Sequence, residues 1–159
     1  MVKKLVCGMM VTMTALANIS NVMAGQACKP IGGVGTANFY AEGENKPIII
    51  SATMIGSVSH AAGKITAQRK TATGLEMDME HYFGTNEASG MQTRDLGVLT
   101  AVPGKPGRYM LEITYTIQEG VTRGTLKGYK GQFKSFGLAD LRDPNDMKAL
   151  VRYSGEICK

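Results

Sequence analysis

Hydrophobic alternation with a period of two, interrupted at short intervals by glycine and proline, is the feature that most constrains this chain. In the segment GLEMDMEHYFG, residues 74–84, three acidic residues share one parity and two methionines share the other. Such alternation is typical of a strand with one wet face and one buried face. No segment sustains a 3.6-residue period, so we expect little helix.

The alternating segments predict eight strands, separated by turns rich in Gly, Pro, Asn and Asp. The strands are expected at residues 34–40, 47–58, 63–70, 75–83, 93–102, 108–118, 132–141 and 148–157. Short connections favour antiparallel neighbours. Eight strands in meander order predict an all-β fold, an eight-stranded antiparallel up-and-down barrel, because closure removes exposed sheet edges. A two-sheet sandwich is the alternative.

Residues 1–24 have the features of a secretory signal peptide. Two lysines precede an apolar run, and Val22 and Ala24 occupy the two small-residue positions of a cleavage site. We therefore expect export to the periplasm or the exterior, and a single barrel domain at residues 25–159. The apolar run is short for a membrane span, so no stable membrane anchor is expected.

Removal of that segment leaves 16 basic and 13 acidic residues, scattered along the chain. A solvated surface explains this mild excess, and we expect no nucleic-acid partner. The only two histidines, His60 and His81, belong to no spaced ligand set, so neither a metal site nor another cofactor is expected.

A catalytic set is not evident, and the sequence leaves enzymatic activity open while favouring a non-enzymatic role. Glu76, Asp78 and Glu80 would lie roughly 6.5–7 Å apart along a strand, which suits paired carboxylates, but solvated charges on a wet face are the ordinary case. The segment GGVGTAN, residues 32–38, has half of a dinucleotide-binding fingerprint. Without a preceding strand it is interpreted as a mobile entry into the first strand.

The inward parity of three strands defines candidates for a ligand site in the lumen. They are His81, Met77, Met79, Tyr109, Tyr115 and Tyr153. An apolar interior with a few polar tips suits a small hydrophobic or amphipathic molecule. A core filled by side chains is the alternative, since eight strands enclose a space that side chains alone can fill.

Two cysteines, Cys28 and Cys158, remain after the signal segment. They flank the first and last strands, which are neighbours across the seam of a meandering barrel. In an oxidising compartment we expect them to form a disulfide that fastens this seam. Between the last strands, Gly120, Gly124 and two further glycines predict a tight crossing over a barrel mouth.

The last third of the chain carries a resemblance to a known family. GTLKGYKG (124–131), followed by a strand and then VRYSGEIC (151–158), resembles the bacterial secreted proteins of the allene oxide cyclase barrel-like group. DLGVLTAVPG (95–104) and GRYMLEITYTI (107–117) resemble the preceding strands of that group. The group is related to plant dirigent proteins and allene oxide cyclases.

This resemblance implies an eight-stranded antiparallel barrel with an internal cavity, and a homo-oligomer as an option, since plant members are often trimers. No cyclase active-site set matches residue by residue, so no catalytic residue carries over. Three functions remain open: a barrel that binds a small ligand in its lumen, an isomerase or dirigent-like guide of a reactive intermediate, and a structural or host-facing secreted protein with a filled barrel.

Overall fold

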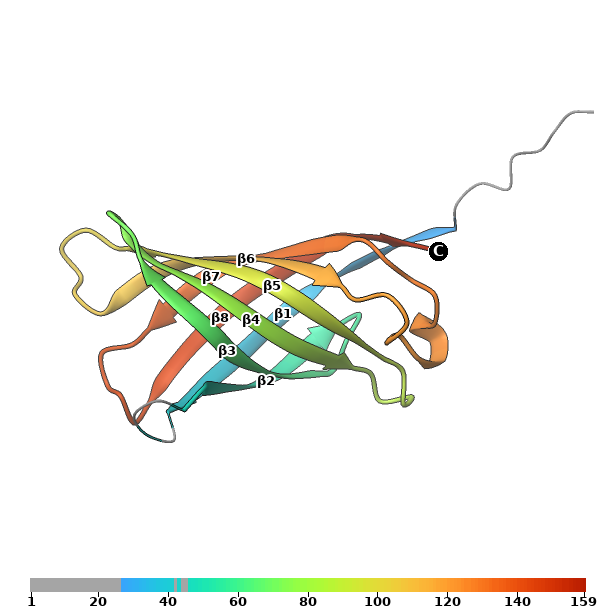
Figure 1. The fold of residues 1–159 in the computed structure, drawn as a ribbon, viewed down its shortest axis with the longest axis horizontal. Helices are drawn as coiled ribbons and strands as arrows, with labels where there is room; N and C mark the ends of the chain where they lie inside the picture. Colours follow the sequence, from blue (N-terminus) through green and yellow to red (C-terminus); the bar gives the residue numbers. More distant parts are fainter. Residues whose placement is uncertain (1–26, 42, 44–45) are drawn as a thin grey trace, which may run out of the picture.

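The computed structural model describes residues 27–41, 43 and 46–159, so the expected signal segment lies outside the described residues. Eight antiparallel strands close into a barrel in sequence order (Figure 1). The strands are β1 (Cys28–Ala41), β2 (Ile48–Gly56), β3 (His60–Lys70), β4 (Gly74–Gly84), β5 (Gly90–Ala101), β6 (Arg108–Ile117), β7 (Gln132–Asp140) and β8 (Met147–Cys158). The predicted up-and-down barrel is confirmed, and the sandwich is excluded.

The first strand is the element whose start differs most from the expectation. β1 begins at Cys28, so the GGVGTAN segment lies inside the strand, and its interpretation as an entry loop was wrong. The reason is the pairing with β8, which runs from Cys28–Cys158 to Phe39–Met147 and fixes the glycine-rich segment as a strand. Local sequence gives no signal for a partner that follows more than a hundred residues later.

The two ends of the barrel differ. One, which we call the disulfide end, carries the connections 57–59, 85–89 and 118–131 together with both cysteines. The other, which we call the open end, carries the connections 71–73, 102–107 and 141–146. Figure 1 shows these two groups of loops at opposite ends of a long barrel.

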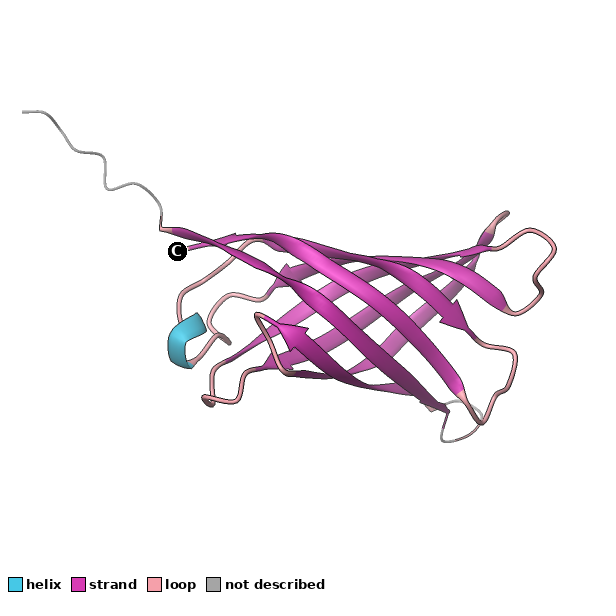
Figure 2. Ribbon diagram, turned by 180° about the vertical axis from the view of Figure 1, so that it is seen from behind, coloured by secondary structure: helices cyan, strands magenta, loops and turns pink. Residues whose placement is uncertain are grey.

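A long crossing covers the disulfide end, as the glycine run predicted. It contains the only helix in the described part of the chain, the short 3-10 helix η1 (Gly124–Leu126), seen in cyan in Figure 2. Gly120, Gly124, Gly128 and Gly131 all have positive φ angles, between 61° and 113°. Leu126 is buried, so this segment closes the barrel.

Aromatic side chains fill the interior at the disulfide end. Tyr115 stacks on Phe133 with ring centroids 4.6 Å apart, and Phe83 meets both rings edge to face. Tyr153 continues the cluster, and its hydroxyl accepts a hydrogen bond from the Val58 backbone N–H at 3.2 Å. Offset and edge-to-face pairs of this kind add to the free energy gained from burial. This half of the barrel is a packed core.

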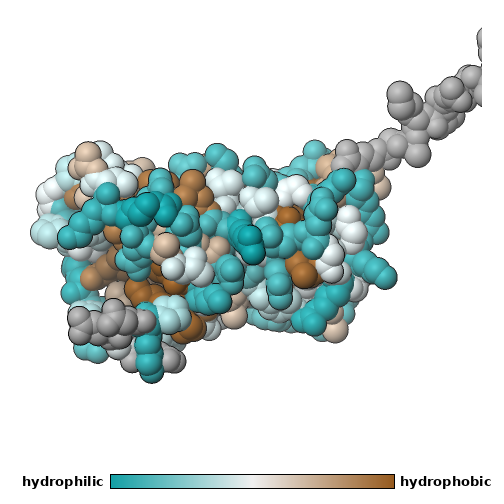
Figure 3. Space-filling model, in the orientation of Figure 1, coloured by the Kyte–Doolittle hydropathy of each residue, from teal (hydrophilic) through white to brown (hydrophobic). Residues whose placement is uncertain are grey.

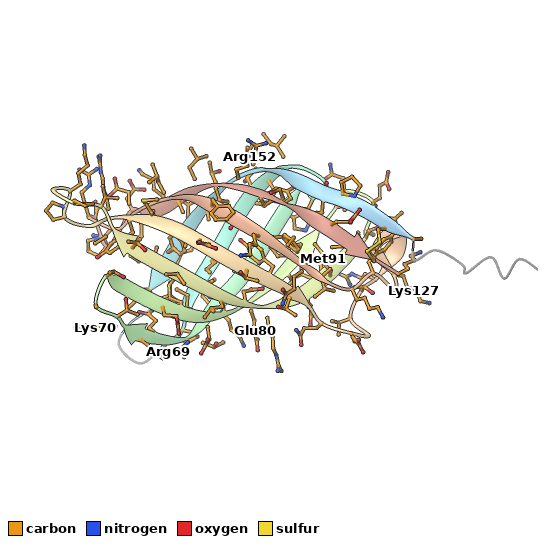
Figure 4. All side chains as sticks on the ribbon, turned by 90° about the horizontal axis from the view of Figure 1, so that it is seen from above. Arg69, Lys70, Glu80, Met91, Lys127 and Arg152 are labelled. Atoms are coloured by element: carbon orange, nitrogen blue, oxygen red, sulfur yellow. A yellow bond between two sulfur atoms is a disulfide. The ribbon has the colours of Figure 1, made fainter. Side chains whose placement is uncertain are left out.

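The outer wall carries the acidic face of β4, as the alternation predicted. Glu76 and Asp78 both pair with Arg69, and Glu80 pairs with Lys64 at 3.2 Å. Figure 4 shows Glu80 and Arg152 on the outside of the wall. Exposed ion pairs contribute little to stability, so these carboxylates act mainly in solvation.

The outer wall is not uniformly polar, because several strands also place large apolar side chains there. The exposed apolar residues include Val34, Ile55, Leu96, Met110, Phe136, Leu138 and Leu150. Met110, Leu138 and Leu150 are consecutive cross-strand partners on β6, β7 and β8. Alternation along a single strand therefore does not always distinguish the inner face from the outer one.

The disulfide between Cys28 and Cys158 is present, as predicted. The two residues face each other across the β1–β8 ladder, with Cα atoms 4.0 Å apart and a sequence separation of 130 residues. A cross-link over such a long loop removes much conformational entropy from the unfolded chain. It also joins the first strand to the last at the point where each has fewest neighbours.

Replacing both cysteines, as Cys28→Ala/Cys158→Ala, should lower the free energy of unfolding by about 2–5 kcal/mol, since the unfolded chain regains its loop entropy. Urea denaturation followed by far-ultraviolet circular dichroism measures the change. Reductant should destabilise the wild type and leave the variant unaffected. Equal denaturation midpoints for wild type and variant would show that the bond does not stabilise the seam.

Candidate functional site

A row of five alanines crosses the inner wall obliquely, from Ala61 near the start of β3 to Ala139 near the end of β7. Along the sheet, Ala61 pairs with Ala52, Ala52 with Ala37, Ala37 with Ala149, and Ala149 with Ala139. The row therefore crosses five consecutive strands, from β3 through β2, β1 and β8 to β7. Side chains of one carbon cannot reach the middle of an eight-stranded barrel, where larger residues normally fill the space.

Large apolar side chains from β4, β5 and β6 face the alanine row. Met77, Met79, Leu99, Leu111 and Ile113 are all buried there. The two walls leave a cavity of about 100 Å³ between them. Figure 3 shows apolar residues inside a hollow at the open end of the molecule. The lumen is thus open in one half and filled in the other. The sequence left two alternatives, a ligand cavity and a core filled by side chains, and each describes one half of the barrel.

The rim of this cavity is also mainly apolar. Phe39, Ile48, Leu75, Leu141 and Met147 line it and are partly buried. Gln68 is a polar residue at the rim and is exposed to solvent. An entering molecule would therefore meet apolar surface from the rim inward.

A buried histidine–carboxylate pair lies at the inner end of the cavity. Nδ1 of His81 on β4 is 2.7 Å from Oδ2 of Asp95 on β5, and the side chains are 5% and 0% exposed. A carboxylate can only accept, so Nδ1 carries the hydrogen and donates it to Asp95. The His81 ring also lies 5.7 Å from the rings of both Phe83 and Tyr115, measured between centroids.

Polar atoms in and beside this pair lack hydrogen-bond partners. Among the described residues, the second oxygen of Asp95, Oδ1, and the hydroxyl of Thr93 are shut off from solvent without a hydrogen-bond partner. Burial of a carboxylate costs several kcal/mol of solvation free energy. Only a well-paired carboxylate, with all its hydrogen bonds made, offsets a cost of this size. Such a cost in an otherwise apolar lumen indicates a role other than stability.

Tyr115 and Ser135 form a second polar contact beside the pair. The tyrosine hydroxyl and the serine Oγ are 3.0 Å apart, and both residues are buried. Burial raises the pKa of Tyr115 well above its usual value, so the phenol stays neutral. Since its hydroxyl is already bonded to Ser135, Tyr115 offers the cavity mainly a ring face.

The six lumen candidates from the sequence are divided between different environments. Met77, Met79, His81 and Tyr115 line the cavity. Tyr109 is only partly buried and does not line the cavity; it borders a surface groove at the open end that adjoins the cavity rim at Leu75 and Leu141. Tyr153 is fully buried in the aromatic cluster at the disulfide end, away from the cavity.

Sequence reasoning missed Asp95 and the alanine row. On β5, Asp95 points inward while Leu96 and Val98 point outward, which reverses the usual pattern. The register settles the matter, because Asp95 lies opposite Met79 on one side and Tyr115 on the other, both inward residues. The alanines give no signal individually, and only their alignment across five strands makes a cavity.

No family model, curated protein or solved structure matches this chain. Within the described residues, no helix is both long and apolar enough to cross a membrane. The function must therefore be inferred from the lumen itself.

Separate and joint replacement of the buried pair should give non-additive effects on stability. His81→Leu leaves the Asp95 carboxylate buried without its partner and should cost about 3–5 kcal/mol of unfolding free energy. The double variant His81→Leu/Asp95→Leu should be more stable than His81→Leu, because no charge is left in the lumen. Urea denaturation of the wild type, His81→Leu, Asp95→Leu and the double variant measures this. Additive losses would show that the two side chains are not energetically coupled.

Proposed function

We propose that this protein is an exported barrel that binds one narrow apolar group of a small molecule in the open half of its lumen. The alanine row carries the proposal, since it leaves an apolar cavity where the same barrel would otherwise be filled. Burial of apolar surface in such a cavity supplies the binding free energy.

The size of the cavity limits the ligand. Its volume is about 100 Å³. Pockets for drug-sized ligands have about 300–1,000 Å³, whereas an apolar cavity of about 150 Å³ holds benzene. A single alkyl chain or a small ring therefore fits, and the rest of a larger amphipathic molecule would lie outside the rim. This makes a narrow apolar segment, inserted from the open end, the part of a ligand that the site selects.

Two further observations support the proposal. The Cys28–Cys158 disulfide suits an oxidising compartment, as the signal-like segment at residues 1–24 also predicts. The closed eight-stranded barrel is the fold implied by the resemblance to the allene oxide cyclase barrel-like group. Neither observation identifies the ligand. The inference about its chemical class rests on the cavity alone.

A second candidate is an isomerase that moves a proton on a bound intermediate, and the His81–Asp95 pair is the observation that favours it. A histidine oriented by a carboxylate is a common general base. Turnover of an unsaturated epoxide by the wild type, absent in Asp95→Asn, would support this candidate over simple binding.

The binding proposal predicts a chain-length series. Linear 1-alkanols from propanol upward should bind about fourfold more tightly for each added methylene, because each buried CH₂ contributes about 0.8 kcal/mol. The gain should stop once the chain fills the cavity. Binding is followed through methyl-¹³C-methionine signals, where Met77 and Met79 should shift and the exposed Met110 should not.

Filling the cavity provides the matched control. Ala149→Leu places a larger side chain within the alanine row and should abolish the shifts of Met77 and Met79. Ala62→Leu makes the same change at an exposed position of β3 and should leave binding unchanged. Shifts that persist in Ala149→Leu would place the alkanols elsewhere and refute the proposal.

A further inference from the structure

The His81 imidazole is held so that one nitrogen remains available to a ligand. Nδ1 faces β5 and bonds to Asp95. On the other side the Cδ2 edge lies against Gly63 of β3, where a Cβ would come within 2.5 Å of Cδ2. With both flanking atoms fixed by neighbouring strands, the far atoms Cε1 and Nε2 point away from β4 and into the barrel.

Nε2 has no hydrogen-bond partner among the described residues, although the ring is buried and lines the cavity. It does not belong to the set of fully enclosed polar atoms without partners, which contains only Thr93 Oγ1 and Asp95 Oδ1 in the described part of the chain. Nε2 therefore keeps some accessible surface, and because the ring points into the barrel we infer that this surface faces the cavity. The two other polar side chains that line the cavity do not compete with it, since Tyr115 bonds to Ser135 and Gln68 lies exposed at the rim.

The chemistry of Nε2 follows from its partner. With the Nδ1 hydrogen donated in a hydrogen bond to Asp95, the neutral form of the ring presents a lone pair at Nε2, which is an acceptor. A negatively charged ligand group would lie near the Asp95 carboxylate in an apolar space, which is unfavourable. The group that suits this nitrogen is neutral and donates a hydrogen bond.

We propose that His81 anchors a hydroxyl group at the inner end of the cavity, so that the ligand is a neutral, hydroxyl-bearing apolar molecule that enters hydroxyl first. This inference rests on the proposed lumen site and names the ligand class of that site. Asp95 is a positioning residue, which fixes the hydrogen on Nδ1 and keeps Nε2 as the acceptor.

The test compares two isomers of equal size, butan-1-ol and 1-methoxypropane. Both have the same heavy atoms, but only the alcohol can donate a hydrogen bond. Butan-1-ol should bind the wild type about three- to tenfold more tightly, which is the usual contribution of one hydrogen bond. The Nε2 signal of His81 in ¹⁵N spectra should shift with the alcohol, and exposed His60 serves as the internal control.

Two variants separate the anchor from a structural role. His81→Asn keeps an N–H donor near the position of Nδ1 and removes Nε2, so the preference for the alcohol should fall to about onefold. Asp95→Asn offers an amide N–H to Nδ1 and moves the ring hydrogen to Nε2, which then donates. The oxygens of the alcohol and of the ether both accept hydrogen bonds, so in this variant the alcohol should lose its preference while both probes still bind. A collapse of the cavity would instead weaken the binding of both.

Each outcome decides one of the two ideas. Equal binding of alcohol and ether by the wild type would refute the anchor while leaving the apolar site intact. Tighter binding of butanoate than of butan-1-ol would also refute it, because the ring would then be a charged donor for carboxylates. Absence of binding by every probe, together with a flat chain-length series, would refute the proposed function and the anchor together.

Discussion

Twelve residue pairs join β1 to β8, from Cys28–Cys158 at the disulfide end to Phe39–Met147 near the open end. This pairing turns a meander of eight strands into a closed barrel, and it removes the two sheet edges that would otherwise be exposed. Pro30, which has no N–H to donate, lies in the part of β1 that extends beyond β2. The disulfide fastens the same seam at its outer end.

The register of this seam also creates the cavity. Ala37 lies opposite Ala149 because of it, and this contact joins a run of three alanines on β3, β2 and β1 to a pair on β8 and β7. A shift of one residue would turn the side chains of β1 to the opposite face. The same register places Tyr153 opposite Gly33 towards the other end, where the Tyr153 ring packs beside Phe133 in the filled interior. One pairing therefore sets both the hollow half and the filled half of the lumen.

The His81–Asp95 pair is the exception to an otherwise apolar interior. Apolar residues at these two positions would avoid the solvation cost of a buried carboxylate, so the fold does not need the pair for stability. The pair lies at the inner end of the cavity, where the fixed imidazole offers one defined hydrogen-bonding atom. Few other polar atoms face this space, so the pair can orient a ligand there. Functional sites typically contain residues that reduce the stability of the fold in this way.

The sequence by itself determined the strands, their meander order, the closed barrel and the pairing of Cys28 with Cys158. These follow from local rules, namely a period of two, turn residues and the two cysteines outside the signal-like segment. It also placed Met77, Met79 and His81 inside, because their strand has a clearly acidic outer face. The tertiary structure alone decided the inward position of Asp95, the separation of Tyr153 from the cavity, the position of Tyr109 beside the cavity rim, and the alanine row. The physical reason is that a cavity and a buried pair depend on which residues meet across strands, and cross-strand register is set by the closure of the whole barrel, which no single segment of sequence contains.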